Sequence, residues 1–407
     1  MTEESHGTTA TTGPADLGSA VDTARGRLDD GADGTASIVA RTRAHFARLA
    51  DPLSPTAVPS HPAGADGTAG TPVPPPAVDP AMLRRAALYA ADGLVGDSAE
   101  FTEECTFHLA TLGRDLRKYG VTTAHYGAAA EAAGRAVCEA FDVPYPGADL
   151  TYRRAEELGI PDGLTELLQA VDNAVRIVAL GAVEDDEAGV PASITAEVLE
   201  VVPRTPQVTV VRLQASSPQT GWPGQSLEVR TPSDPDVWHQ FASTLPPNDA
   251  GYLEFHCPGL TAHVGETWVV ANPAGGLGVP TGQDAPDAVA MVALGAGLAA
   301  LRALVLDVSA MDDSPPVHLF WGVDHSRDLH GLTDLRGLAQ GFPWLTFTPL
   351  VADEGDPGAA AAAADDPVTH RPGTLVLVSG EDVAGVRDAV GVLTRAGVDA
   401  EQIIAEP

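Results

Sequence analysis

One stretch decides the fold of the C-terminal part of this chain: Ala288-Val289-Ala290-Met291-Val292-Ala293-Leu294-Gly295-Ala296-Gly297. Its first seven residues are all apolar, which is typical of a strand buried on both faces of a parallel sheet. The two glycines allow a tight turn, and a helical pattern follows them. The order strand, glycine turn, helix predicts the first unit of an α/β domain.

The same order repeats toward the C-terminus. Strands are expected at 288–294, 317–323, 345–351 and 374–379, and they alternate with helices near 297–308, 327–340 and 382–397. This alternation predicts a doubly wound α/β domain of the nucleotide-binding type over residues 285–407. The alanine run at 359–364 is expected to be an inserted flexible loop.

Toward the N-terminus the hydrophobic period changes to two. Strands are expected at 193–202, 207–214, 225–231, 251–257 and 265–271, with proline, glycine and aspartate turns between them. Short alternating strands joined by such turns are typical of an antiparallel sheet that closes on itself. We therefore predict an antiparallel β-barrel over residues 190–284.

Before the barrel the spacing is helical. Apolar residues recur at three and four positions through 19–50, 82–112, 123–141 and 163–184, which predicts an all-helical domain over 19–187. Residues 1–18 contain too few large apolar groups to fold and are expected to form a disordered tail. Residues 51–80 are rich in proline, which removes backbone donors, and are expected to form an inserted loop.

The chain is strongly acidic. Its 407 residues include 56 Asp and Glu against 23 Lys and Arg, a formal net charge of −33, which repels phosphate backbones and anionic lipid. We expect neither nucleic acid nor membrane as a partner. The N-terminal residues lack a signal-peptide pattern, so a cytoplasmic location is expected. Cys105, Cys138 and Cys257 form no ligand or disulfide pattern and are expected to be buried thiols.

Three motifs resemble one known family. They are Leu112–Val121 followed by His125-Tyr126, Val317–Gly322, and Phe342–Pro349. The chain resembles a divergent flavohaemoglobin, in which a globin domain is fused to a ferredoxin-NADP reductase-type module. The resemblance implies a globin-like helical domain, an FAD-type barrel and an NAD(P)-type α/β domain. It also implies FAD, NAD(P)H and haem as cofactors, and nitric oxide dioxygenase activity.

The residue at the haem-ligand position departs from that family. Leu116 stands where the resemblance places the proximal histidine, and an alkyl side chain offers iron no lone pair. Tyr126, which in the family braces that histidine, is retained. His108, two helical turns before Leu116, is the one alternative ligand considered. We predict that haem is absent and that the chain holds no metal.

The flavin motif is only partly present. The family binds FAD through an Arg-x-Tyr-Ser motif. The corresponding segment here is Trp238–Ser243, in which only Ser243 clearly matches the motif. Gly224 and Gln225 match the family's turn near the flavin. We assign Gly224, Gln225 and Ser243 as flavin-type residues, but no arginine is present to pair with the diphosphate.

The nucleotide-type residues are better preserved. Gly295, Ala296, Gly297 and Leu298 form the strand-to-helix turn that can direct free amides at a phosphate. Ser379 and Gly380 occupy the positions of the family's Cys-Gly-Pro motif, and the residues that follow them here are Glu381 and Asp382. These two carboxylates disfavour an anionic cofactor, so NAD(P)H binding is not favoured by the residues themselves.

Three functions follow from these motifs. The first is a flavohaemoglobin-like oxidoreductase whose degenerate sites leave it with weak or no family activity. The second is a non-catalytic binding, sensing or scaffold descendant, whose partner is a nucleotide, another small molecule or an unidentified protein. The third is a haem-free flavin reductase. Absorption bands of haem and flavin would distinguish them.

Overall fold

The computed structural model describes residues 16–28, 38–50, 80–95, 99–147, 150–206, 208–219, 221–356 and 358–406. These form two compact units, Met1–Ala192 and Ser193–Pro407. Residues 1–15 of the expected disordered tail and 51–79 of the expected proline-rich insertion lie outside the described residues. Among the described residues, no helix is long and apolar enough to cross a bilayer.

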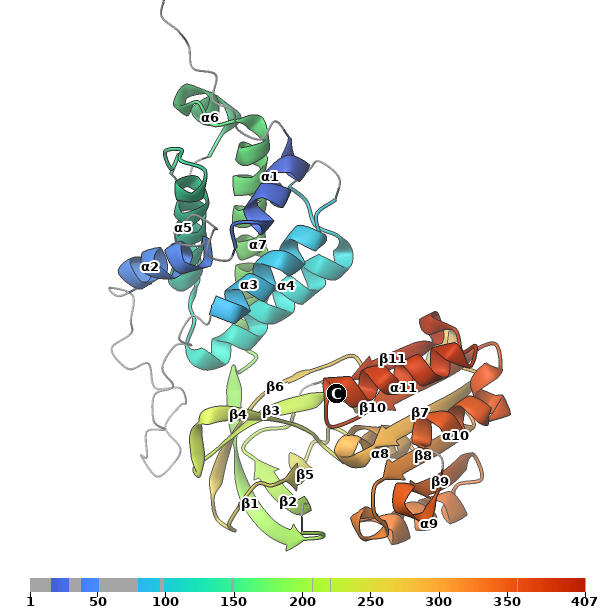
Figure 1. Cartoon of the computed structure of the whole chain (residues 1–407). Coiled ribbons are helices and arrows are strands. Elements are labelled where there is room, and N and C mark those ends of the chain that lie inside the picture. The colour runs from blue at the N-terminus through green and yellow to red at the C-terminus, as the bar shows by residue number, and fades with distance from the viewer. Residues whose placement is uncertain are drawn as a thin grey trace, which may run out of the picture. The chain divides into compact units, whose positions relative to one another are not determined.

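The described part of the first unit consists of helices and contains no strand, as predicted (Figure 1). Its helices are α1 (Leu17–Arg25), α2 (Ile38–Ala50), α3 (Pro80–Asp92), α4 (Glu103–Leu116), α5 (Thr123–Ala140), α6 (Tyr152–Leu158) and α7 (Asp162–Glu187). Helix α1 begins inside the stretch expected to be a disordered tail, because Leu17 is buried in the helical core.

Two glycines let α4 and α7 pack backbone to backbone. A Cβ on Gly113 would lie 1.7 Å from the carbonyl oxygen of Val178, and a Cβ on Gly181 would lie 2.1 Å from that of Ala110. No side chain fits at either contact, so α4 is fixed closely against α7 along the segment that ends at Leu116.

The second unit begins with a six-stranded antiparallel sheet of order β4-β3-β6-β1-β2-β5. Its strands are β1 (Ser193–Pro203), β2 (Val208–Ala215), β3 (Ser226–Thr231), β4 (Asp234–Ala242), β5 (Tyr252–Pro258) and β6 (Thr267–Ala274). The sheet curls so that a bridge between Ser243 and Phe255 joins its two edges. Sequence reasoning found five of these strands and missed β4.

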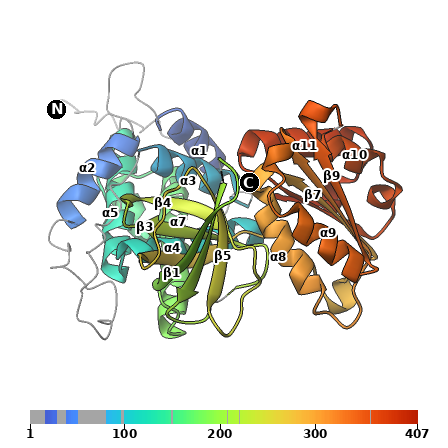
Figure 2. The same cartoon turned by 90° about the horizontal axis from the view of Figure 1, so that it is seen from below.

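A five-stranded parallel sheet follows, of order β11-β10-β7-β8-β9. Its elements are β7 (Ala288–Leu294), α8 (Leu298–Val308), β8 (Val317–Val323), α9 (Leu332–Gly341), β9 (Leu345–Val351), α10 (Ala359–Asp365), β10 (Thr374–Ser379), α11 (Val383–Arg395) and β11 (Ile403–Glu406). One face of the sheet packs against α8 and α9 and the other against α10 and α11 (Figure 2).

The expectation of a flexible loop at 359–364 is wrong. These alanines form α10, and Ala359, Ala360, Ala363 and Ala364 are buried against the parallel sheet. Small side chains at adjacent turns allow a short helix to lie close to β7 and β8, and alanine has the highest helix propensity. The alanine run resembles a low-complexity segment in composition, but its side chains form the surface through which α10 packs on the sheet.

The three cysteines are buried and unpaired, as expected from their spacing. Cys105 and Cys138 lie in the helical unit, and Cys257 lies on β5. Burial raises the pKa of the Cys138 thiol to about 12, so this thiol stays protonated at neutral pH.

Candidate functional site

The helical unit contains a cavity of about 300 Å³. Its wall comes from α1, α2, α3, α4, α5 and α7 and includes both Leu116 and Tyr126. Most of the other lining residues are alanine, leucine and valine. The segment that sequence reasoning assigned to the haem site therefore does border a cavity.

The polar side chains of this wall are already partnered. Arg25 pairs with Asp92, and the hydroxyl of Thr42 donates to the carbonyl of Ile38 at 2.8 Å. The hydroxyl of Tyr126 donates to the carbonyl of Gly113 at 3.2 Å. The surface that remains for a ligand is alkyl and aromatic.

The cavity does not fit haem, because no described lining residue is a histidine, cysteine or methionine. Tyrosinate can also ligate haem iron, but the Tyr126 hydroxyl already donates a hydrogen bond to the Gly113 carbonyl, and burial raises its pKa. His108 is absent from the wall. It is exposed and packs edge-on against Tyr89 and Phe107.

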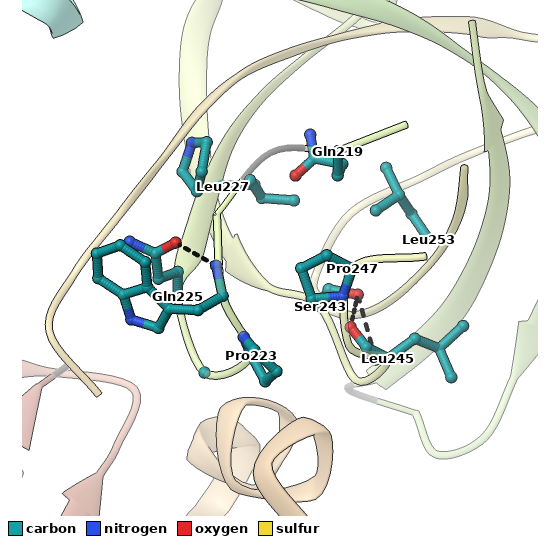
Figure 3. Close-up of a pocket in the computed structure, with 11 residues that line it drawn as sticks. Gln219, Pro223, Gln225, Leu227, Ser243, Leu245, Pro247 and Leu253 are labelled. Carbon is teal, nitrogen blue, oxygen red and sulfur yellow. Dashed lines mark hydrogen bonds between the residues drawn. The ribbon is translucent and has the colours of Figure 1, made fainter. Parts of the chain in front are cut away.

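The flavin-type residues come together on the curled sheet. Gly224, Gln225 and Ser243 line one small cavity of about 20 Å³ (Figure 3). That volume holds roughly one water molecule, far less than an isoalloxazine ring requires.

The side chains of Gln225 and Ser243 form hydrogen bonds within the protein. Gln225 accepts from the backbone N–H of Trp222 at 2.9 Å and donates to the carbonyl of Gly275 at 3.1 Å. The Ser243 hydroxyl donates to the carbonyl of Leu245 at 2.9 Å. No arginine is found among its described lining residues. These residues do not fit FAD.

A larger pocket lies at the carboxyl ends of the parallel strands. It measures about 480 Å³ and includes Gly295 and Ala296 at the end of β7, Gly322 at the end of β8, and Glu381 after β10. This edge is where open α/β sheets bind their ligands. Two residues of the predicted nucleotide-type turn, Gly295 and Ala296, therefore line a pocket in the structure.

Three contacts hold the glycine turn. The indole N–H of Trp321 donates to the carbonyl of Gly295 at 2.9 Å. A Cβ on Gly297 would lie 2.2 Å from the carbonyl oxygen of Ser379, so Gly297 permits close packing against Ser379 and Gly380. The backbone N–H of Ala296 donates to the Glu381 carboxylate at 2.7 Å.

The remaining nucleotide-type residues face the core rather than the pocket. Leu298, the first residue of α8, is buried in the core on one face of the parallel sheet, and Ser379 is buried on β10, between β7 and β11. Neither residue is part of the pocket wall.

The charges of this pocket do not fit a dinucleotide. Asp324, Asp328, Glu381 and Asp382 line it, and its described wall has no lysine or arginine. Two phosphates bound in this pocket would lie among four carboxylates. Charges of the same sign that line one pocket repel each other.

A buried histidine pair stands behind the pocket. His330 lines the pocket, and its Nε2 lies 3.1 Å from Nδ1 of His256 on β5. Burial, together with the charge of His330, lowers the pKa of His256 to about 3, and burial also lowers the pKa of His330. Both rings are neutral at pH 7 and supply no positive charge for a phosphate. Sequence reasoning missed this pair, since residues 74 positions apart carry no spacing signal.

Comparison with solved structures identifies the architecture. A crystal structure of flavohaemoglobin from Malassezia yamatoensis, with bound FAD and haem, matches 95% of this chain and 98% of its own length, with a TM-score of 0.64 and 16% identity. This chain has the fold of a flavohaemoglobin. The resemblance stated from the Leu112, Val317 and Phe342 motifs is therefore confirmed at the level of the fold.

Curated proteins match only part of this flavohaemoglobin fold. The phenol hydroxylase P5 protein of Acinetobacter pittii is 25% identical over 166 residues, which cover 38% of this chain and 46% of that protein. The toluate 1,2-dioxygenase electron transfer component of Pseudomonas putida is 27% identical over 139 residues, 32% of this chain and 40% of that protein. The chain thus spans less than half the length of either relative. No protein-family model matches it.

Proposed function

We propose that this chain is a haem-free binding protein that keeps the flavohaemoglobin fold and holds an apolar small molecule in its helical cavity. The observation that carries this proposal is the wall of the cavity, where every polar side chain described is partnered and the exposed surface is alkyl and aromatic. Apolar cavities of this kind remain dry and take up apolar ligands.

The energetics favour such a ligand. Removing apolar surface from water stabilises a complex by roughly 25 cal/mol for each Å² buried. A polar ligand would lose its hydrogen bonds to water without finding free donors or acceptors in the wall. The proposal therefore names the chemical class of the ligand as apolar and of small-molecule size.

The second part of the proposal is that the reductase-type unit does not pass hydride to haem. Its flavin-type side chains, Gln225 and Ser243, hydrogen-bond to backbone groups of the protein, and its nucleotide-type pocket is lined by acids. These contacts support a role in binding rather than in electron transfer.

The test for ligand binding uses N-phenyl-1-naphthylamine, a neutral fluorescent probe. Wild-type protein is expected to give saturable fluorescence enhancement, and A133F, which adds a ring to the cavity wall, is expected to weaken binding at least tenfold. A124F places the same ring on the exposed face of the same helix and is expected to bind like wild type. Equal binding by A133F and wild type would refute the apolar site.

The test for haem uses the full chain expressed with a haem precursor. Wild-type protein is expected to show no band near about 410 nm. L116H, which restores an imidazole to the cavity wall, is expected to retain more haem than F107H, whose histidine would stand on the exposed face of α4. Stoichiometric haem in the wild type would overturn the haem-free proposal.

A second candidate is a haem-free flavin reductase. It is favoured by the partial match to a protein named as an electron transfer component. This function requires bound flavin, with absorption bands near about 380 and 450 nm in protein purified from riboflavin-supplied cells. A spectrum with those bands and no haem band would favour this candidate over the first.

A further inference from the structure

The glycine turn of the parallel sheet is closed by a carboxylate of the same chain. Oε1 of Glu381 accepts a hydrogen bond from the backbone N–H of Ala296 at 2.7 Å. The same oxygen would lie 2.4 Å from a Cβ on Gly295, whose φ of +56° also suits glycine. The carboxylate is therefore packed directly over the turn.

This amide is the group that a phosphate oxygen would use. Free N–H groups between a parallel strand and the next helix bind the phosphates of dinucleotides. A carboxylate oxygen has the same sign of charge and makes the same kind of short, charge-assisted hydrogen bond. A ligand phosphate and Glu381 therefore compete for one donor.

The surroundings of Glu381 hold it in this place. It lies between β10 and α11, whose first turn is capped by Asp382 through the N–H of Gly385 at 2.8 Å. The turn itself is anchored by the bond from Trp321 to Gly295 at 2.9 Å. The two segments that meet in this contact are thus anchored by these bonds, while the Glu381 side chain itself is exposed in the bend between β10 and α11.

The same arrangement occurs a second time in this unit. The N–H of Gly276, in the glycine-rich segment after β6, donates to the carboxylate of Glu406 on β11. In each of two glycine segments, one backbone N–H thus donates to a glutamate carboxylate from the C-terminal part of the chain, Glu381 after β10 and Glu406 on β11.

We propose that Glu381 is an internal anion that occupies the phosphate place of the Gly295–Gly297 turn and thereby excludes dinucleotides from the pocket. Removal of this one carboxylate frees the Ala296 amide for a phosphate group. The inference concerns the second unit and does not depend on what the helical cavity binds.

The test compares full-length wild type, E381A and D388N by titration with inorganic pyrophosphate and with ADP. D388N removes one negative charge from an exposed position of α11 and serves as the matched control. Wild type and D388N are expected to show no saturable binding at millimolar ligand. E381A is expected to bind both ligands at least tenfold more tightly.

The amide of Ala296 provides an independent measurement. Its ¹⁵N–¹H resonance is expected to shift in E381A relative to wild type, and to shift again when pyrophosphate is added to E381A but not to wild type. Three results overturn the proposal: binding by wild type equal to that by E381A, no gain of binding in a folded E381A, or an equal gain in D388N.

Discussion

The cavity of the helical unit and the pocket of the parallel sheet differ in what their walls expose. The cavity is lined mainly by alkyl and aromatic side chains, and Leu116 occupies the position that the resemblance assigns to an iron ligand. The pocket is lined by carboxylates, and one of them, Glu381, accepts the hydrogen bond of the Ala296 amide. The polar side chains described in the cavity wall and the Ala296 amide all have partners within the protein, but only the pocket keeps a backbone donor at the turn.

The difference has a physical consequence for how each site could regain a ligand. A buried alkyl wall must acquire a new ligating atom and the partners that orient it. The Ala296 amide, whose hydrogen bond is accepted by Glu381, needs only the removal of that carboxylate to become available to a ligand. Four predictions, ordered from the largest expected effect to the smallest, test whether the two regions behave as separately as this comparison requires.

The largest effect is expected for G113A in the helical unit. Its Cβ would meet the Val178 carbonyl at 1.7 Å, so α4 and α7 must move apart, and the free energy of unfolding should fall by about 3 kcal/mol or more. All five tryptophans lie at or beyond residue 222, in the second unit. Loss of helical circular dichroism should therefore move to lower temperature while the tryptophan fluorescence transition stays in place.

The control for G113A is G127A. Gly127 lies in α5 with open space around its Cβ position, so alanine there should stabilise the helix by roughly 0.5–1 kcal/mol. If G113A lowers both transitions equally, the two units are not separate in stability and the comparison fails.

The next effect is acid sensitivity of the second unit. The folded pKa of His256 is about 3, below its usual value near 6.5, so the unfolded chain binds more protons between these pH values. Stability contributed by the neutral ring should be full above about pH 6.5 and fall by about 1.4 kcal/mol per pH unit between about pH 6.5 and 3, which amounts to about 2 kcal/mol at pH 5. Urea unfolding followed by tryptophan fluorescence measures this slope.

H256Q should flatten that slope, because glutamine does not titrate in this range. The control H108Q removes an exposed histidine of the helical unit, and the slope reported by the tryptophans of the second unit should stay as in wild type. The buried-pair explanation is wrong if H256Q and H108Q have the same pH dependence.

A smaller effect is expected for D382A. The Asp382 carboxylate accepts from the N–H of Gly385 at 2.8 Å and caps α11, and losing an aspartate cap costs about 1 kcal/mol. The expected result is a lower midpoint of thermal unfolding, followed by tryptophan fluorescence. A midpoint within error of wild type would show that Asp382 is not a structural cap.

The smallest effect is expected for Y126F. It removes the hydrogen bond to Gly113 at 3.2 Å and should reduce the unfolding free energy by roughly 0.5 kcal/mol, the low end of the range for a neutral hydrogen bond, because this bond is long. Since the ring stays in the wall, binding of the naphthylamine probe should be unchanged. A large loss of probe binding would mean that the hydroxyl contacts the ligand.

Local sequence pattern predicted four of the five strands of the parallel sheet closely and missed the short edge strand β11. The expected ranges 288–294, 317–323, 345–351 and 374–379 coincide with β7, β8, β9 and β10, because buried strands are short apolar runs between polar turns. The half-exposed strand β4 was missed, since its residues 234–242 carry no clean alternation. The α10 alanines were misjudged, because composition does not reveal which surface a small residue packs against.

The sites were predictable only as positions along the chain. Sequence reasoning located Leu116, Gly295 and Gly380 in their motifs, and it noted that Glu381 disfavours an anion. It did not reveal that Glu381 bonds to Ala296, or that His256 meets His330, because both contacts join segments distant in the chain. Such contacts depend on tertiary packing rather than on local propensity.

The abundance of alanine around the helical cavity bears on how this protein can evolve. Alanines on α1, α3, α5 and α7 line it, and each one can become valine or leucine by a single substitution that adds a few carbon atoms to the wall. Because helices tolerate many residue types at little cost in propensity, the size of the accepted molecule can change stepwise across descendants while the bundle itself is preserved.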